Sequence, residues 1–173
     1  MQRKTLIGAA VVLVGLGLWY AFRPERLFIN KTVNESLAVA STPTLAMSTG
    51  TEDANGAPRA IASGRFHSNA HETKGQATIY RLADGKQVLR LTGFETSNGP
   101  DVRVYLVAAS DVNDNATVKR AGFVEVGALK GNRGDQNYDV PAGVDLTKYR
   151  TVTIWCRRFS VNFGSAPLTG GQS

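Results

Sequence analysis

The stretch "QATIYRLADGKQVLRLTGF", residues 76–94, most constrains how this chain can fold. Two short apolar runs flank Asp84–Gly85, and an Asp-Gly pair accepts the positive φ angles that a tight hairpin turn requires. In the second run the side chains alternate from residue 87 to residue 92, and Gly93 allows a β-bulge. The stretch therefore predicts an antiparallel β-hairpin.

Further short apolar runs with turn residues between them follow the hairpin. They read "DVRVYLVAA", "GFVEVGAL", "DQNYDVP", "TVTIWC" and "VNFGSAPL". Turns recur at roughly the 8–12-residue spacing of sandwiches and barrels. No convincing amphipathic helix stands out, and "DLTKYR" fits one short turn. Residues 61–168 therefore predict an all-β domain, an antiparallel β-sandwich of about eight strands.

The formal net charge of +6 is spread along the chain. The first sixty residues carry +2 and the remainder carries +4, with lysines and arginines interleaved with acidic residues. A nucleic-acid footprint would instead concentrate basic residues on one segment or face. We therefore expect a solvated surface and no nucleic-acid partner.

The stretch "TLIGAAVVLVGLGLWYAF", residues 5–22, contains no charged residue. Eighteen helical residues span roughly 27 Å, close to the hydrocarbon core of a bilayer. Trp19, Tyr20 and Phe22 end the run with aromatic side chains that favour the membrane interface. A cleaved secretory signal would have a shorter apolar run and a small-residue cleavage site. The stretch therefore predicts an uncleaved transmembrane signal anchor.

The remaining segments follow from this anchor. Residues 1–4 form a short basic N-terminus, residues 23–60 a flexible linker rich in small and polar residues, and residues 169–173 a C-terminal tail. The basic residues on the two sides of the span nearly balance. Export of the long C-terminal part is nevertheless the usual arrangement for one N-terminal span. We expect a membrane-anchored protein whose domain is extracytoplasmic, at the cell surface or in the periplasm.

Cys156 is the single cysteine of the chain, in "TVTIWCRRF". Alternation places it on one strand face with Val152 and Ile154, whereas Trp155 lies on the other. The apolar register shifts near Arg157–Arg158, which suggests a bulge. Two interpretations stay open: a small buried hydrophobe, or a thiol whose pKa falls beside arginine and that takes part in redox chemistry.

His67 and His71 form "HSNAH" in a segment predicted as loop or strand edge. With Cys156 they make a weak three-ligand metal hypothesis. No histidine or methionine follows Cys156 to complete a blue-copper site. No firm metal site and no cofactor is evident, and no hydrolase or phosphate-loop motif occurs.

Several strings together resemble the DM-thirteen (DM13) domain, a family associated with electron transfer. They are "LRLTGFETSNGPDVRVYL", "LKGNRGDQNYDVP" and "VTIWCRRFSVNFGSAPL". The resemblance covers residues 61–168 and implies a β-sandwich with a redox role centred on Cys156. It also includes Asp101 and Trp155 among its motif positions.

The leading hypothesis is therefore a membrane-anchored electron-transfer or thiol-redox domain. Cys156 would be its candidate redox thiol, and a redox protein would be its partner. Arg157 and Arg158 would favour the thiolate, with Trp155 and Asp101 as supporting residues. The alternative is a non-catalytic surface module that binds a ligand or protein and has a structural Cys156. A stand-alone enzyme is the less favoured interpretation.

Overall fold

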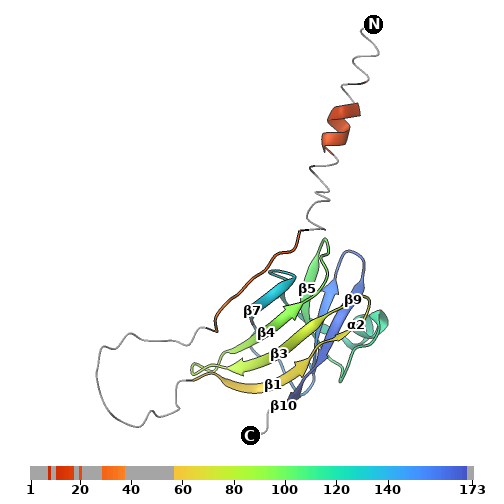
Figure 1. Cartoon of the computed structure of the whole chain (residues 1–173). Helices are drawn as coiled ribbons and strands as arrows, with labels where there is room; N and C mark the ends of the chain where they lie inside the picture. The colour runs from red at the N-terminus through yellow and green to blue at the C-terminus, as the bar shows by residue number, and fades with distance from the viewer. Residues whose placement is uncertain (1–7, 9–10, 18–19, 21–28, 38–56, 171–173) are drawn as a thin grey trace, which may run out of the picture.

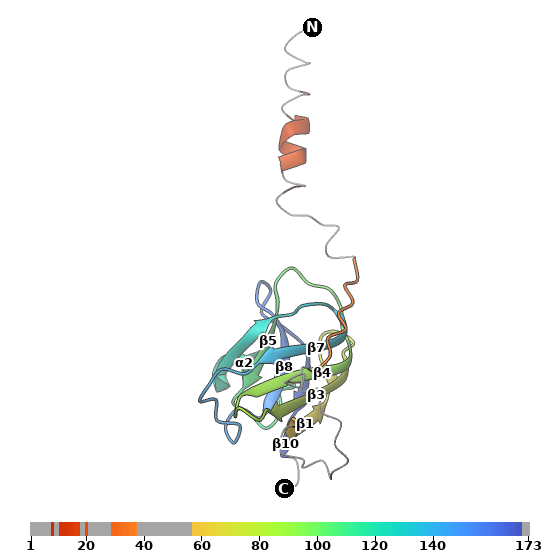
Figure 2. The ribbon, with the colours of Figure 1, turned by 90° about the vertical axis from the view of Figure 1, so that its left-hand side faces the viewer.

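The computed structural model describes residues 8, 11–17, 20, 29–37 and 57–170. In the domain these form ten strands and one short helix (Figures 1 and 2). In chain order the elements are β1 (Arg59–Arg65), β2 (His67–Ser68), β3 (Lys74–Arg81), β4 (Gln87–Glu95), β5 (Val102–Val107), α2 (Asn115–Ala121), β6 (Phe123–Ala128), β7 (Arg133–Asp139), β8 (Thr151–Cys156), β9 (Val161–Pro167) and β10 (Thr169–Gly170).

The strands of the described domain form two five-stranded sheets that pack face to face. One sheet has the order β10-β1-β3-β4-β7, and the other has the order β2-β9-β8-β5-β6. Every strand pair within them is antiparallel. The all-β sandwich is confirmed. The count exceeds the predicted eight because β2 and β10 are only two residues long, too short to leave a pattern in the sequence.

The hairpin that organises the first sheet is confirmed. The amide of Leu82 donates to the carbonyl of Lys86 at 2.8 Å, and Gly85 has a φ of 82°. The bulge at Gly93 is also present: its φ is 56°, and the β4–β7 ladder jumps from Leu91 to Phe94. Only glycine adopts this conformation readily.

Alternating side chains of the two inner faces fill one continuous core. Ile79 and Leu89 from the first sheet and Val104 and Ile154 from the second have no exposed surface. Truncating such a side chain to alanine typically costs about 2–5 kcal/mol. The core therefore fixes the strand ends and the loops between them, which form the candidate site.

The domain contains one short helix that the sequence pattern did not indicate. Helix α2 has seven residues, and its N-cap Asp114 accepts a hydrogen bond from the amide of Thr117. Val118 is its one buried residue, so no apolar stripe marks the helix in the sequence. The signal was the capping aspartate, which favours a helix start.

The predicted membrane span at residues 5–22 lies partly outside the described residues. Residues 8, 11–17 and 20 are helical. Among the described residues, no helix is both long enough and apolar enough to cross a bilayer. The structure thus gives no support to the predicted span.

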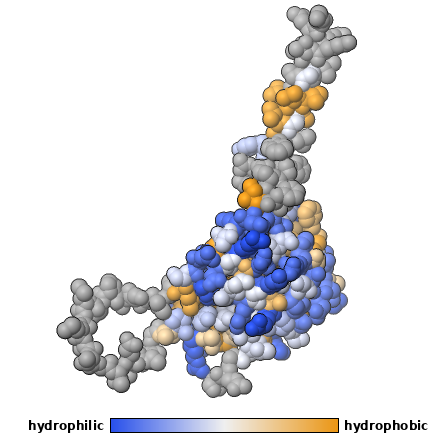
Figure 3. Space-filling model, in the orientation of Figure 1, coloured by the Kyte–Doolittle hydropathy of each residue, from blue (hydrophilic) through white to orange (hydrophobic). Residues whose placement is uncertain are grey.

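The face of the domain in Figure 3 is mostly hydrophilic. Its charges meet in ion pairs such as Arg90–Asp135 at 2.7 Å and Arg133–Glu95 at 2.9 Å. This arrangement explains why the net charge does not gather into a single basic surface here.

Candidate functional site

Cys156 is the last residue of β8, and its side chain points into the sandwich. Its exposure is 0%, and it belongs to the apolar core with Val152 and Ile154. The residue directly opposite on β5 is Val102. Opposed side chains of an antiparallel pair lie on one face, roughly 5 Å apart, so Val102 packs beside the sulfur. Cys156 thus shares a strand face with Val152 and Ile154, as the alternation predicted.

Trp155 lies on the other face of β8, as the alternation predicted. It is buried with Tyr105 and Val118 beneath α2 and the loop before it. The ring centroids of Trp155 and Tyr105 are 6.4 Å apart. The indole therefore packs the outer face of the second sheet, and the sheet separates it from the Cys156 side chain.

Arg157 and Arg158 lie in a hairpin turn, and the β8–β9 ladder has a register shift close by, where Ile154 pairs with Gly164 and Trp155 with Asn162. Residues 157–160 connect β8 to β9, and Ser160 has a φ of 55°. A turn reverses the strand and so resets the apolar alternation, which the sequence pattern alone could not distinguish from a bulge. Both arginines are exposed, whereas Cys156 is enclosed.

Asp101 holds two arginines at this end of the domain. Its Oδ2 accepts from Nε of Arg157 at 2.8 Å, and its Oδ1 accepts from Nε of Arg103 at 2.6 Å. Partial burial raises the pKa of Asp101, but the two guanidinium groups outweigh it and hold that pKa below its usual value. Arg157 is therefore committed to a carboxylate, which fixes the loop after residue 100.

The two histidines take part in separate local contacts. Nε2 of His67 lies 2.8 Å from Oδ1 of Asp111, and the ring of His71 packs on Phe163 with centroids 3.9 Å apart. Within the described ranges, no three His, Cys, Asp or Glu side chains gather as a metal site would require. Cys156 is thus not brought together with the histidines.

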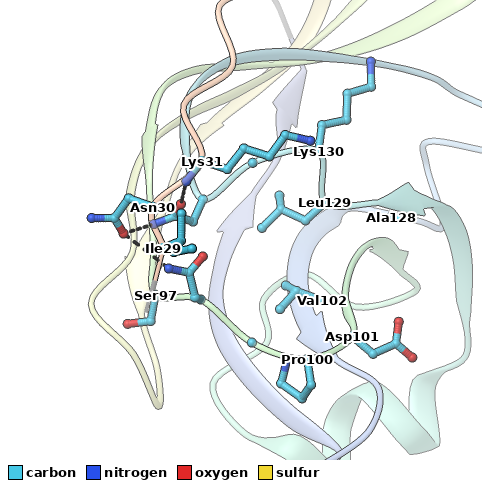
Figure 4. Close-up of a pocket in the computed structure, with 14 residues that line it drawn as sticks. Ile29, Asn30, Lys31, Ser97, Pro100, Asp101, Val102, Ala128, Leu129 and Lys130 are labelled. Atoms are coloured by element: carbon cyan, nitrogen blue, oxygen red, sulfur yellow. Dashed lines mark hydrogen bonds between the residues drawn. The ribbon is translucent and has the colours of Figure 1, made fainter. Parts of the chain in front are cut away.

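A pocket of about 670 Å³ opens beside Val102 (Figure 4). We call it the motif pocket. Three segments form its walls: residues 29–31, 97–102 and 128–132. Val102 and Leu129 contribute apolar side chains to the hollow, whereas the carboxylate of Asp101 points away from it. The pocket volume lies within the range of about 300–1,000 Å³ that is typical of small-molecule sites.

Buried polar side chains support the 128–132 wall. Gln136 has no exposed surface and bonds both main-chain groups of Gly131, accepting at 3.1 Å and donating at 2.8 Å. The Tyr138 hydroxyl donates to Gln136 at 2.8 Å and accepts from the amide of Lys130 at 3.0 Å. Burial raises the pKa of Tyr138 to about 12, so the hydroxyl keeps its proton and remains a donor. The loop is therefore rigidly placed.

Residues 29–37, which we call the strap, lie along the edge of β7. The amides of Val33 and Glu35 donate to the carbonyls of Arg133 and Asp135, each at 2.9 Å. Thr32 forms a parallel bridge with Arg133. The strap thus covers an otherwise open sheet edge, and its first residues complete the motif pocket. These residues lie within the predicted linker, whose residues 23–28 and 38–56 are outside the described part.

Side chains fasten both ends of the strap. Its Glu35 carboxylate accepts from Nζ of Lys130 at 2.9 Å and from the amide of Asn137 at 2.7 Å. Towards the other end, Oδ1 of Asn132 accepts from the amide of Lys31 at 2.7 Å. These contacts join the strap to the same loop that walls the pocket.

Two glycines of the domain permit this close approach. A Cβ at Gly131 would collide with the carbonyl oxygen of Lys31, and a Cβ at Gly134 would collide with that of Val33. Gly134 also has a φ of 93°, which favours glycine. The backbone of β7 is thus shaped to accept an extended segment.

Acid is expected to loosen the strap. Lys130 and the Asn137 amide hold the pKa of Glu35 below its ordinary 4.5 in the docked state. Because the pKa of Glu35 is lower in the docked strap than in the released strap, its carboxylate stabilises docking fully at pH values above the ordinary pKa. This contribution is lost as the pH falls through the lowered pKa. Amide exchange protection at Val33 should fall about fivefold in Glu35→Gln at pH 7. The same decrease is expected in the wild type as the pH falls through the lowered pKa of Glu35.

Glu72→Gln provides the matched control, because Glu72 also pairs with a lysine, Lys74, but forms no hydrogen bond or ion pair with the described strap residues. Unchanged protection of Val33 in Glu35→Gln would show that the ion pair does not hold the strap.

Comparison with known families adds one result to this geometry. The sequence model of the family described as Electron transfer DM13 matches residues 65–168. This chain belongs to the DM13 family. The match covers the sandwich from the end of β1, and the strap lies outside it. No curated protein and no solved structure matches the chain significantly.

The DM13 strings "NGPD" and "LKGN" meet in space at the motif pocket. The pocket was not predicted from the sequence. The pocket joins segments about thirty and seventy residues apart in the chain, and no local spacing signals that. The ion pair between Glu35 and Lys130 joins the strap to the pocket loop, but nothing in the sequence indicates that these two residues meet.

Proposed function

We propose that this DM13 protein is a membrane-anchored, extracytoplasmic electron-transfer protein. In this proposal the motif pocket binds a small redox-active ring compound of the quinone or flavin kind. A redox protein partner delivers or removes the electrons of the bound ring. The observation that carries the proposal is that two separate family strings and the strap converge to build one pocket.

The lining of the motif pocket supports this ligand class. Val102, Leu129, Ile29 and Pro100 offer apolar surface, which suits the faces of a ring. Asparagine side chains and main-chain groups at the rim suit its polar edge, since such sites combine apolar walls with a few placed polar groups.

The apolar surface of the N-terminal helix supports the membrane anchor. Val11, Val12, Leu13, Val14 and Leu16 are each at least 60% exposed. A large contiguous apolar surface of this kind marks a membrane or protein interaction site. The extracytoplasmic location rests on the arrangement usual for a single N-terminal anchor.

The burial of Cys156 supports a structural role in this proposal. Thiol exchange needs an accessible thiolate, and the sulfur has no exposed surface. One observation favours thiol redox chemistry as a second candidate: Val102, the pocket residue, is the direct neighbour of Cys156 across the strand pair. In that candidate a bound partner displaces Val102 and reaches the sulfur.

Ligand titration of the full-length protein in nanodiscs tests the pocket. Flavin mononucleotide and a water-soluble short-chain quinone serve as the probes, and the methyl resonances of Val102 and Leu129 are followed. We expect saturable shifts with at least one probe. Gly131→Ala should weaken that binding about tenfold, because the added Cβ displaces the strap and removes a pocket wall.

Gly170→Ala is the matched control, since a Cβ there meets no atom within 4 Å. Absence of shifts at both methyl groups with both probes would refute the pocket as a redox-ligand site. Equal binding of the probe by Gly131→Ala and the wild type would show that the strap does not contribute to the ligand site.

A further inference from the structure

A second pocket lies at the opposite end of the sandwich. It has a volume of about 700 Å³, and Gln87 at the start of β4 lines it, whereas the motif pocket begins just after β4 ends. Strand β4 has nine residues, so the two pockets are separated by roughly 27 Å along it. We call this hollow the arginine pocket; Ile61 of β1 and both residues of β10 also line it.

Arginines at the arginine pocket have no acidic partner within the described part of the chain. Arg81 and Arg150 line it, and Arg59 lies directly opposite Arg81 across the β1–β3 pair. Like charges in this position repel each other. No ion pair involving Arg59, Arg81 or Arg150 occurs among the described residues.

Only some of the other arginines differ from these three, because Arg65, Arg120 and Arg158 also form no ion pair among the described residues. Arg90, Arg103, Arg133 and Arg157 all form ion pairs with aspartate or glutamate. The arginine pocket therefore has unpaired positive charge at its rim, from Arg81 and Arg150 with Arg59 beside Arg81, and this charge raises the local potential for an anion.

The floor of the arginine pocket is apolar. Ile61, Val144, Leu146 and Leu168 line it and pack on the main core. The one acidic residue in the lining is Asp145, whose Oδ1 accepts from the amide and the hydroxyl of Thr147 at 2.8 and 2.7 Å. That carboxylate is engaged within its own turn.

We propose that the arginine pocket binds an amphipathic anion, a carboxylate or phosphate head group on an aliphatic body. Guanidinium groups match both head groups with paired hydrogen bonds. The aliphatic body would cover the Leu146 and Leu168 side chains, whose burial favours binding in proportion to the apolar area covered. The site is separate from the motif pocket, so the two proposals fail independently.

Titration of the full-length protein in zwitterionic nanodiscs with octyl phosphate and with octanoate tests this site. The readouts are the methyl shifts of Leu146 and Leu168 and the affinity derived from them. We expect saturable binding by both probes, at least tenfold tighter than inorganic phosphate or octyltrimethylammonium. Arg81→Gln and Arg150→Gln should each weaken it about tenfold, because each removes a charged hydrogen-bond donor.

Arg120→Gln is the control, since Arg120 is an exposed arginine on α2, outside the arginine pocket. Circular dichroism verifies that each variant is folded. If Arg81→Gln does not fold, Arg81→Lys takes its place, because lysine keeps the charge but lacks the paired donors of the guanidinium group. Binding of the cationic amphiphile as tightly as octyl phosphate would overturn the proposal. So would binding that none of the arginine variants weakens, or shifts confined to Val102 and Leu129.

Discussion

Replacing Gln136 with leucine is expected to lower the free energy of unfolding by about 3–5 kcal/mol. Gln136 has no exposed surface, and its amide satisfies the amide and carbonyl of Gly131 and the hydroxyl of Tyr138. Leucine has a similar volume but no hydrogen-bonding group. Three buried polar groups would then lose a partner without gaining access to water, which is costly.

The measurement is chemical denaturation of wild type and variant, followed by circular dichroism. Gln76→Leu is the matched control, because Gln76 is an exposed glutamine on β3 and should change stability by less than about 0.5 kcal/mol. Tyr138→Phe should cost about 1–2 kcal/mol, since it removes only the hydroxyl. A Gln136→Leu variant as stable as the Gln76→Leu control would show that the loop is not held in this way.

The same substitution should also disable the motif pocket. Gly131 is both a pocket residue and one of the two glycines that the strap backbone approaches closely. If it moves, Lys31 and its neighbours lose their contacts with Asn132. Probe binding at Val102 and Leu129 should therefore disappear in Gln136→Leu, even at temperatures where the variant is still folded.

The parts of the fold that local patterns encode were predictable. Asp84–Gly85 defines a hairpin by its allowed φ angles, and Gly93 marks a bulge. The alternation in β8 assigned Cys156 and Trp155 to opposite faces, because the period of two depends only on chain geometry. These features need no knowledge of distant residues.

The parts that depend on distant segments were not predictable. Glu35 meets Lys130 across 95 residues, and neither residue type marks such a pair in advance. The site predicted around Cys156 followed from strand position and resemblance. The exposed arginines then turned out to lie beyond the strand end, one of them bound to Asp101. The sequence thus indicated the right end of the domain but not the pocket there.

Cys156→Ser is expected to destabilise the domain by about 2–3 kcal/mol, and Cys156→Ala by about 1–2 kcal/mol. Serine is nearly isosteric with cysteine, but its hydroxyl would be desolvated in a core that offers Val102, Val152 and Ile154 as neighbours. Alanine leaves a small cavity and no unsatisfied group. This order, with serine worse than alanine, is characteristic of an enclosed apolar site, and an exposed thiol would give the reverse or no difference. Denaturation curves of the three proteins measure it.

The same variants separate the two candidate roles of Cys156. A structural cysteine predicts that Cys156→Ala binds the flavin or quinone probe as the wild type does. It also predicts that a thiol reagent labels the folded wild type only as fast as the domain unfolds, because the sulfur has no exposed surface. Rapid labelling of the folded protein would instead support thiol redox chemistry. So would loss of electron transfer to the bound probe in Cys156→Ala with binding retained. Because Val102 alone pairs with Cys156 from β5, Val102→Ala should accelerate labelling in that case, and Val124→Ala on the neighbouring strand should not.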